Sequence, residues 1–162
     1  MFVPFDQLSE YARVWIYQSS RPFTDLETSN VQSDLRAFVN AWTAHNVALL
    51  AYGDVWHDRF VVLMADESHR EASGCSVDRS VHFLEDLERK YDVSLFERKT
   101  VVVKNPDSGE MTSMDLEDLK NNLENGSISL KTLVFDNLIK TKQQFKEEWM
   151  KPLEESWHIR FI

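Results

Sequence analysis

The only cysteine of the chain lies near polar, titratable residues, and its surroundings have the residue types that thiol chemistry requires. Cys75 falls just before an expected helix, where free backbone amides and the helix dipole stabilise a thiolate. His82 lies four residues after Asp78, which places both on one side of that helix. This pattern predicts a thiol nucleophile assisted by an imidazole. The alternative is a small buried cysteine in a tight bend, and the Asp78 carboxylate favours it because a nearby negative charge opposes thiol ionisation.

The same helix start is a candidate anion site. Backbone amides from Ser73 to Asp78 would face a phosphate or carboxylate group, as they do at other helix N-termini. The candidate ligand-binding residues are Ser73, Gly74, Cys75, Ser76, Asp66 and Glu67. The alternative is that Ser73 or Ser76 simply caps the helix.

The sequence supports a metal site or a nucleotide site less well than it supports the thiol and anion sites. Acidic residues and histidines between positions 54 and 71 are ligand types that suit a divalent metal ion, but their spacing matches no recognised motif. Numerous acidic residues are also typical of a solvated loop, so we expect no metal site. The chain has four glycines, and neither G-x-x-x-x-G-K-[ST] nor G-x-G-x-x-G can be written with them. We expect no cofactor.

Composition narrows the class of partner. With 162 residues, of which 43% are hydrophobic, the chain can form one globular domain with a substantial core. Its net charge of −9 argues against nucleic acid or an anionic membrane, since both require clustered Lys and Arg. A small molecule, another protein or a second copy of the chain remains as partner. No signal peptide or membrane-spanning run is visible and the single cysteine forms no internal disulfide, so we expect a cytoplasmic protein.

The elements that position these residues follow from hydrophobic periodicity and turn signals. Strands are expected over residues 13–18, 47–56, 59–65 and 99–104, and helices over residues 24–45 and 77–91. Thr24 and Glu27 have the spacing of a capping box. Gly53 predicts a bend or bulge in the second strand. Lysines at positions 140, 142, 146 and 151 predict a solvated helix face.

The order strand, helix, strand, strand, helix, strand is that of the ferredoxin-like βαββαβ unit, whose two helices cover one face of an antiparallel sheet. We therefore predict an α+β fold in a single domain of residues 1–162. Residues 1–104 form its ferredoxin-like half, and residues 105–162 form a C-terminal α/β extension packed on it. The strand residues are apolar on both faces, so the second face must also be covered. The aromatic C-terminal extension is the favoured cover, with a partner subunit or a ligand as alternatives.

Three segments resemble a family of short proteins known from Bacteroidetes: Ala72–Val81, Arg13–Tyr17 and Arg21–Phe23. The likeness spans most of the chain. Some members carry the label "ABC transporter ATPase", whereas this chain lacks the Walker A glycines and lysine that cradle phosphates. The resemblance implies a complete bacterial protein and assigns no activity to any residue.

From these observations we predict a non-catalytic binding or interaction protein, with a small anionic ligand bound by the loop and helix start over residues 66–78. The alternative function is that of a thiol-dependent enzyme using Cys75, with His82 as its assisting group.

Overall fold

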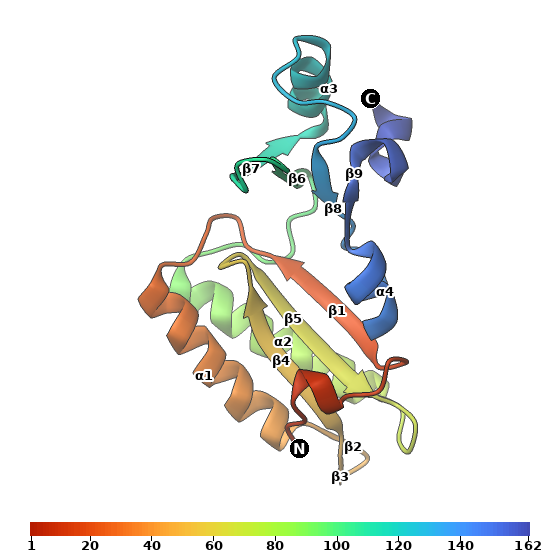
Figure 1. Cartoon of the computed structure of the whole chain (residues 1–162). Helices are drawn as coiled ribbons and strands as arrows, with labels where there is room; N and C mark the ends of the chain where they lie inside the picture. The colour runs from red at the N-terminus through yellow and green to blue at the C-terminus, as the bar shows by residue number, and fades with distance from the viewer. The chain divides into compact units, whose positions relative to one another are not determined.

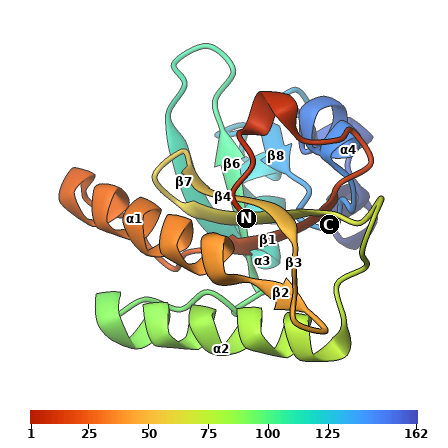
Figure 2. The same ribbon diagram turned by 90° about the horizontal axis from the view of Figure 1, so that it is seen from below.

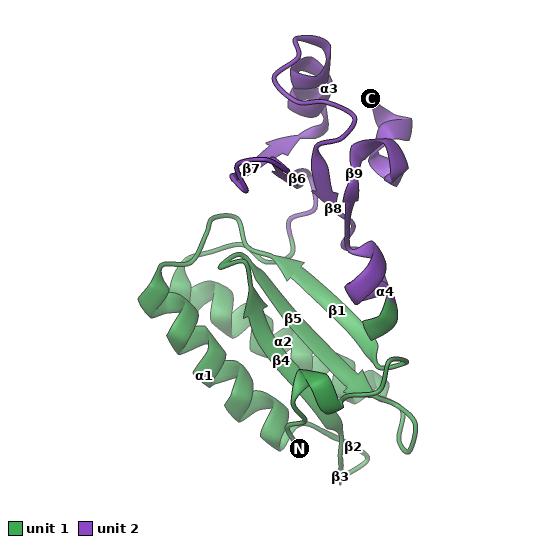
Figure 3. Cartoon of the chain, viewed as in Figure 1, with its two compact units in different colours: residues 1–96, 140–143 green, residues 97–139, 144–162 purple.

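The computed structural model describes every residue from Met1 to Ile162 and divides the chain into two compact units (Figures 1 and 3). Unit 1 consists of Met1–Phe96 and Lys140–Gln143, and unit 2 consists of Glu97–Ile139 and Gln144–Ile162. Helices and antiparallel sheets together confirm the predicted α+β class. None of the helices has the length and apolar character that crossing a membrane requires.

The sheet of unit 1 contains three antiparallel strands in the order β1–β5–β4. Their bounds are Arg13–Gln18 for β1, Leu50–Trp56 for β4 and Phe60–Asp66 for β5. The central strand β5 is buried on both faces, which explains its unbroken apolar sequence. Between β4 and β5 the chain reverses over residues 57–59, and the positive φ angles of 55° and 54° at His57 and Asp58 are typical of a tight hairpin connection. The predicted antiparallel hairpin is confirmed.

Two helices lie over one face of this sheet, α1 (Asp25–Ala41) and α2 (Gly74–Tyr91) (Figure 2). The predicted capping box opens α1, because Glu27 N–H donates to Thr24 Oγ1 at 3.1 Å and Thr24 N–H donates to Glu27 Oε1 at 2.9 Å. The helix ends earlier than predicted, since the next residues form a small ribbon. Its strands are β2 (Thr43–Ala44) and β3 (Val47–Ala48).

Gly53 serves close packing rather than a bend. It pairs with Leu63 in a regular register along β4 and β5, so the predicted bend or bulge is wrong. A Cβ at this position would lie 3.2 Å from both Leu63 Cδ2 and Val39 Cγ1. Because a glycine has no such atom, α1 can approach the strand closely.

Short segments cover both edges of the three-stranded sheet. The N-terminal segment runs parallel to β4, where Val3 N–H donates to Ala51 O at 2.7 Å. At the opposite edge, Lys140–Gln143 lies along β1, where Val14 N–H donates to Lys140 O at 2.9 Å. Covered edges leave few backbone groups free to pair with another chain.

The fourth strand of a ferredoxin-like unit does not join this sheet. The residues predicted as that strand form β6 (Thr100–Lys104), which pairs with β7 (Met111–Asp115) and β8 (Leu133–Phe135) in unit 2. A turn ending at Gly109, with φ of 75°, returns the chain directly beside β6. Such a local hairpin closes a much shorter loop than pairing with β1 would. The prediction that residues 1–104 complete a ferredoxin-like half is therefore wrong in its last strand.

The face of the sheet away from the helices is also apolar and buried. Three side chains of β5 on this face have no exposed surface: Phe60, Val62 and Met64. The N-terminal segment supplies part of the cover, because the Phe5 ring lies 5.4 Å from the rings of Tyr52 and Trp56. That residues 105–162 supply the remainder stays a prediction.

Unit 2 has a second antiparallel sheet in the order β7–β6–β8–β9, with β9 at Met150–Pro152. Its core joins the sheet to α3 (Leu116–Glu124) and to the first of two 3₁₀ helices, at Leu153–Glu155 and Trp157–Phe161. The buried core residues of this unit are Val101, Val103, Leu119, Val134 and Leu153. Helix α4 spans Lys142–Glu148.

A buried histidine should make unit 2 sensitive to acid. His158 is 3% exposed, its Nδ1 lies 2.5 Å from Ser156 Oγ, and burial lowers the pKa of its imidazole below the usual value. Lys151 lowers this pKa further, while Asp136 opposes the shift. Above the ordinary histidine pKa of about 6.5, both folded and unfolded states are neutral here and stability is complete. As the pH falls below that value, the unfolded state takes up a proton first and stability falls.

We therefore compare melting temperatures between about pH 7.5 and about pH 5.5, a range that spans the ordinary histidine pKa of about 6.5. Over this range the melting temperature of the wild-type protein should fall more steeply than that of His158→Gln. Thermal melts of both proteins across this range provide the measurement. The comparison removes the contribution of carboxylates, which is common to both. Parallel pH profiles would contradict the role given to His158.

Candidate functional site

The predicted site lies at the start of α2, and its two serines are engaged by the fold. Ser76 N–H donates to Ser73 Oγ at 3.1 Å, and Ser73 N–H donates to Ser76 Oγ at 3.2 Å. The Ser76 hydroxyl also donates to Thr43 O at 2.8 Å, and Ser76 is 1% exposed. The structure thus shows the capping alternative, in which both serines cap the helix and Ser76 also ties its start to β2.

Few amides at this helix start remain free for an anion. Ala72 N–H donates to Glu67 Oε2 at 2.7 Å, and Val77 N–H donates to Ser73 O at 3.0 Å. Only Gly74 and Cys75 keep amides without an acceptor among the first residues of the predicted site. The Glu67 carboxylate on the neighbouring amide would repel an anion placed there.

The Asp66 carboxylate already accepts hydrogen bonds from a neighbouring residue. It accepts the backbone N–H and the hydroxyl of Ser68, and these hydrogen bonds hold the pKa of Asp66 below its usual value. Asp66, the last residue of β5, is thus an acceptor for the loop that leads to α2, and as a carboxylate it adds no attraction for an anion.

Cys75 and His82 are both exposed but are not brought together. They occupy one helix seven positions apart, which separates them by about 10 Å along the axis. His82 Nδ1 lies 3.9 Å from Glu85 Oε1. An imidazole must come within hydrogen-bonding distance of a thiol to accept its proton, and this helix keeps the two groups apart.

We expect His82→Ala to leave the alkylation rate of Cys75 within about twofold of wild type between pH 6 and 9, because the imidazole does not contact the thiol. Iodoacetamide labelling followed by mass spectrometry measures the rate. Cys75→Ser supplies the unlabelled control. A rate that falls several-fold in His82→Ala would show that the two residues cooperate.

The acidic residues of the β4–β5 hairpin take part in hydrogen bonds of the fold. Asp54 Oδ1 accepts from Gln32 Nε2 at 2.9 Å, and Asp58 Oδ1 accepts from Thr28 Oγ1 at 3.2 Å. No group of three or more His, Cys, Asp or Glu side chains in the structure could hold a metal ion. These carboxylates link the hairpin to α1.

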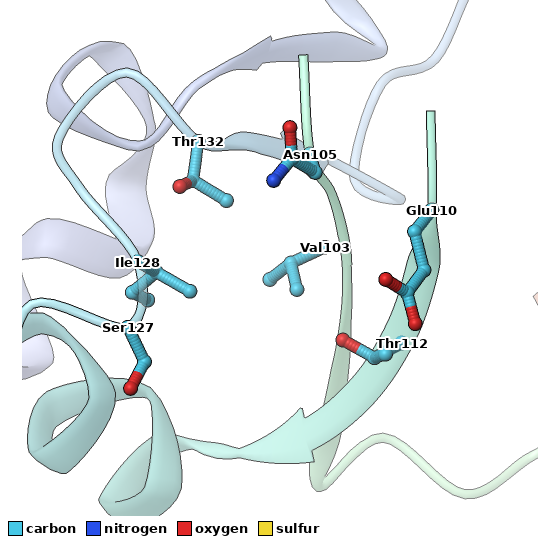
Figure 4. A pocket seen from close by; sticks show the side chains of 7 residues that line it. All are labelled: Val103, Asn105, Glu110, Thr112, Ser127, Ile128 and Thr132. Atoms are coloured by element: carbon cyan, nitrogen blue, oxygen red, sulfur yellow. The ribbon is translucent and has the colours of Figure 1, made fainter. Parts of the chain in front are cut away.

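Unit 2 contains a pocket of about 150 Å³, between the β6–β7 hairpin and the residues that follow α3 (Figure 4). Figure 4 shows Val103 from β6 at its centre, with Ile128 and Thr132 pointing toward it from the opposite side. Polar side chains form the rest of the lining: Asn105, Glu110, Thr112, Ser127 and Thr132. The pocket therefore has an apolar floor and a polar rim.

Two of the polar groups are held in place by the backbone. Thr132 is 7% exposed, and its Oγ1 accepts from Ser129 N–H at 3.0 Å, which leaves its hydroxyl hydrogen to donate. Asn105 Oδ1 accepts from the backbone N–H groups of Asp107 and Ser108, so its amide N–H groups remain available. Both residues thus offer fixed donors to a ligand.

The remaining polar groups are free. The side chains of Glu110, Thr112 and Ser127 make no hydrogen bond and no ion pair within the protein. Glu110 is the only charged residue of the lining. A ligand in this pocket would meet one negative charge, several hydroxyl groups and two fixed donors.

No pattern in the sequence marks this pocket. Its residues come from a strand, a hairpin and a loop, and no local motif connects them. The chain matches no family model, no curated protein and no solved structure among those with which it was compared. The geometry of the pocket is thus the basis for a functional proposal.

Proposed function

We propose that the chain is a non-catalytic binding protein whose ligand is a small polar molecule held in the pocket of unit 2. The observation that carries this proposal is the convergence of five polar side chains around Val103 and Ile128. Ligand sites commonly combine an apolar lining with a few placed polar groups. Two donors there are fixed in advance by hydrogen bonds, so binding would cost little ordering of the protein.

The size of the pocket limits the ligand. Its volume of about 150 Å³ is below the range of about 300 to 1,000 Å³ typical of pockets for drug-sized ligands, so a small ligand fits it best. Glu110 favours a cationic amino group, while the Thr132 hydroxyl and the Asn105 amide favour oxygen acceptors. A short amine that also carries hydroxyl or carbonyl oxygens satisfies both conditions.

The charge of the whole chain supports this class of partner. A net charge of −9 disfavours nucleic acid and anionic membranes as partners, and attracts cationic ligands by long-range electrostatics. The single cysteine has no disulfide partner, which supports a cytoplasmic location. We also propose that the chain is a member of the family of short Bacteroidetes proteins, because the three segments named above resemble that family.

A thermal-shift panel of short amines, amino alcohols, amino acids and polyols tests the proposal. We expect at least one amine to raise the melting temperature of the wild-type protein, because a ligand that binds only the folded state stabilises it. Glu110→Gln should lower the affinity for that amine about tenfold, since the substitution removes a charge-assisted hydrogen bond. Thr132→Val should also lower this affinity, because it removes the hydroxyl donor.

Glu124→Gln is the matched control, because Glu124 is exposed on α3 outside the pocket. It should bind like wild type. A panel in which no compound raises the melting temperature would contradict the proposal. So would equal affinities for wild type, Glu110→Gln and Thr132→Val.

A thiol-dependent enzyme remains the second candidate function, on the single observation that Cys75 is exposed at the start of α2. Such an enzyme needs a group that takes the thiol proton. With His82 two helical turns away, another residue or the substrate would have to supply it.

A further inference from the structure

Arg59 carries a positive charge that has no partner in the protein. The residue is 7% exposed, yet its guanidinium makes no hydrogen bond and no ion pair. Its position is fixed by the backbone, because Arg59 N–H donates to Trp56 O at 3.1 Å and Ser19 N–H donates to Arg59 O at 2.8 Å. The adjacent Asp58 carboxylate is engaged with Thr28.

The other arginines do not share this combination. Three donate hydrogen bonds to acceptors within the protein: Arg21, Arg79 and Arg89. Two lie over aromatic rings: Arg13 and Arg36. The rest are exposed, so water satisfies them: Arg70, Arg98 and Arg160. Arg59 alone is both buried and without an acceptor.

This arrangement is unusual for an arginine. Arginine is almost never fully buried without a partner, because desolvation disfavours its charge. Burial accordingly lowers the pKa of the Arg59 guanidinium from its usual value. A mostly buried charge is screened less by water than one on the open surface, so it interacts more strongly with an incoming anion.

The guanidinium is nevertheless reachable from solvent. No fully buried side-chain nitrogen or oxygen in the structure lacks a hydrogen-bond partner, so the unpaired nitrogens of Arg59 must reach the surface. The residue as a whole is 7% exposed, so only a small part of its side chain meets solvent. A guanidinium in this position matches the two oxygens of a carboxylate or phosphate group.

We propose that Arg59 binds an oxyanion, a carboxylate or phosphate group, through two parallel hydrogen bonds from its guanidinium. The site lies in unit 1, at the turn residue just before β5, and is independent of the pocket in unit 2. It also differs from the start of α2, where most amides are already engaged.

Thermal unfolding in sodium phosphate, sodium acetate and sodium chloride at equal ionic strength tests the proposal. We expect phosphate or acetate to raise the melting temperature of the wild-type protein by about 3 °C at roughly ten times its Kd, relative to chloride. Comparing the shift in phosphate with the shift in acetate shows whether the site prefers a phosphate or a carboxylate group. Arg59→Met keeps the stem but removes the donors, so its melting temperature should not respond.

In chloride, Arg59→Met should melt at or above the wild-type temperature, because the variant no longer buries an unpaired charge. Arg98→Met is the matched control, since Arg98 is exposed and unpaired, and it should keep the full oxyanion response. Thr132→Val should also keep it, which separates this site from the pocket of unit 2.

An equal oxyanion response in wild type and Arg59→Met would overturn the proposal. The absence of any response in the wild-type protein would overturn it as well. If Arg59→Met does not fold, Arg59→Lys replaces it: this variant keeps the charge but loses the two-donor geometry, and its oxyanion response should fall by at least half. An undiminished response in Arg59→Lys would count against the two parallel hydrogen bonds.

Discussion

Replacing Trp42 with alanine is expected to lower the free energy of unfolding by about 4 kcal/mol, within the range for removal of a large buried aromatic side chain. Trp42 has no exposed surface and follows the last residue of α1. Its ring lies 5.7 Å from that of Trp15 and 5.2 Å from that of Phe38. Its Nε1 also donates to Ser76 O at 2.9 Å, so the side chain joins the end of α1 to the first turn of α2.

The loss has two separable parts. Trp42→Phe retains most of the apolar volume but removes the Nε1 donor, which leaves the Ser76 carbonyl without this partner. We expect it to cost about 1 to 2 kcal/mol, the usual penalty for a buried polar group that loses its hydrogen bond. The difference between the alanine and phenylalanine variants then measures the packing contribution.

Urea denaturation of the three proteins provides these free energies. Tyr11→Ala is the control, because Tyr11 is 83% exposed, and its effect should stay within about 0.5 kcal/mol. Equal losses for Trp42→Ala and Trp42→Phe would show that the hydrogen bond to Ser76, rather than packing, joins the two helices.

Local signals in the sequence predicted the elements that depend on few neighbours. The capping box at Thr24 depends on residues three positions apart, and the β4–β5 hairpin depends on one turn, so both are visible without the fold. The sheet that β6 joins was not, because its pairing with β8 rather than β1 is decided by competition among strands distant in sequence. Gly53 was misinterpreted for the same reason: the helix that packs on it lies far from it in sequence.

The candidate sites also include features that local sequence predicts and features that only the fold reveals. The capping alternative at Ser73 could be stated from the sequence, and helical spacing alone already separates Cys75 from His82. The pocket around Val103 could not be predicted, since its lining comes from separate segments. Arg59 gives no signal either, because a charged residue after a hairpin turn is ordinarily solvated and only the fold buries it.

Lys142 is a second charged residue whose burial the sequence did not reveal, and its removal is expected to be costly. The cluster of lysines interleaved with acidic residues predicted a solvated helix face, whereas Lys142 is 2% exposed. Its Nζ donates to Phe5 O at 2.6 Å and to Leu8 O at 2.8 Å, and lies 3.5 Å from Glu10 Oε1. These contacts fasten the N-terminal segment to the residues that cover the edge of β1.

We expect Lys142→Met to lower the free energy of unfolding by about 3 kcal/mol, because each charge-assisted hydrogen bond contributes about 1.5 to 3 kcal/mol and methionine replaces only the stem. Urea denaturation measures the total loss. Hydrogen exchange of the Val14 amide, which donates to Lys140 O, reports whether the edge of β1 opens.

Lys120→Met distinguishes the role of the buried ammonium from the general effect of losing a lysine. Lys120 is exposed on α3, so its replacement should change stability by less than about 0.5 kcal/mol. If Lys142→Met behaved in the same way and Val14 kept its protection, the two hydrogen bonds to Phe5 and Leu8 would only offset the cost of burying the charge. A large loss with faster exchange at Val14 would instead establish that Lys142 holds the N-terminal segment and the β1 edge together as one cooperative part of unit 1.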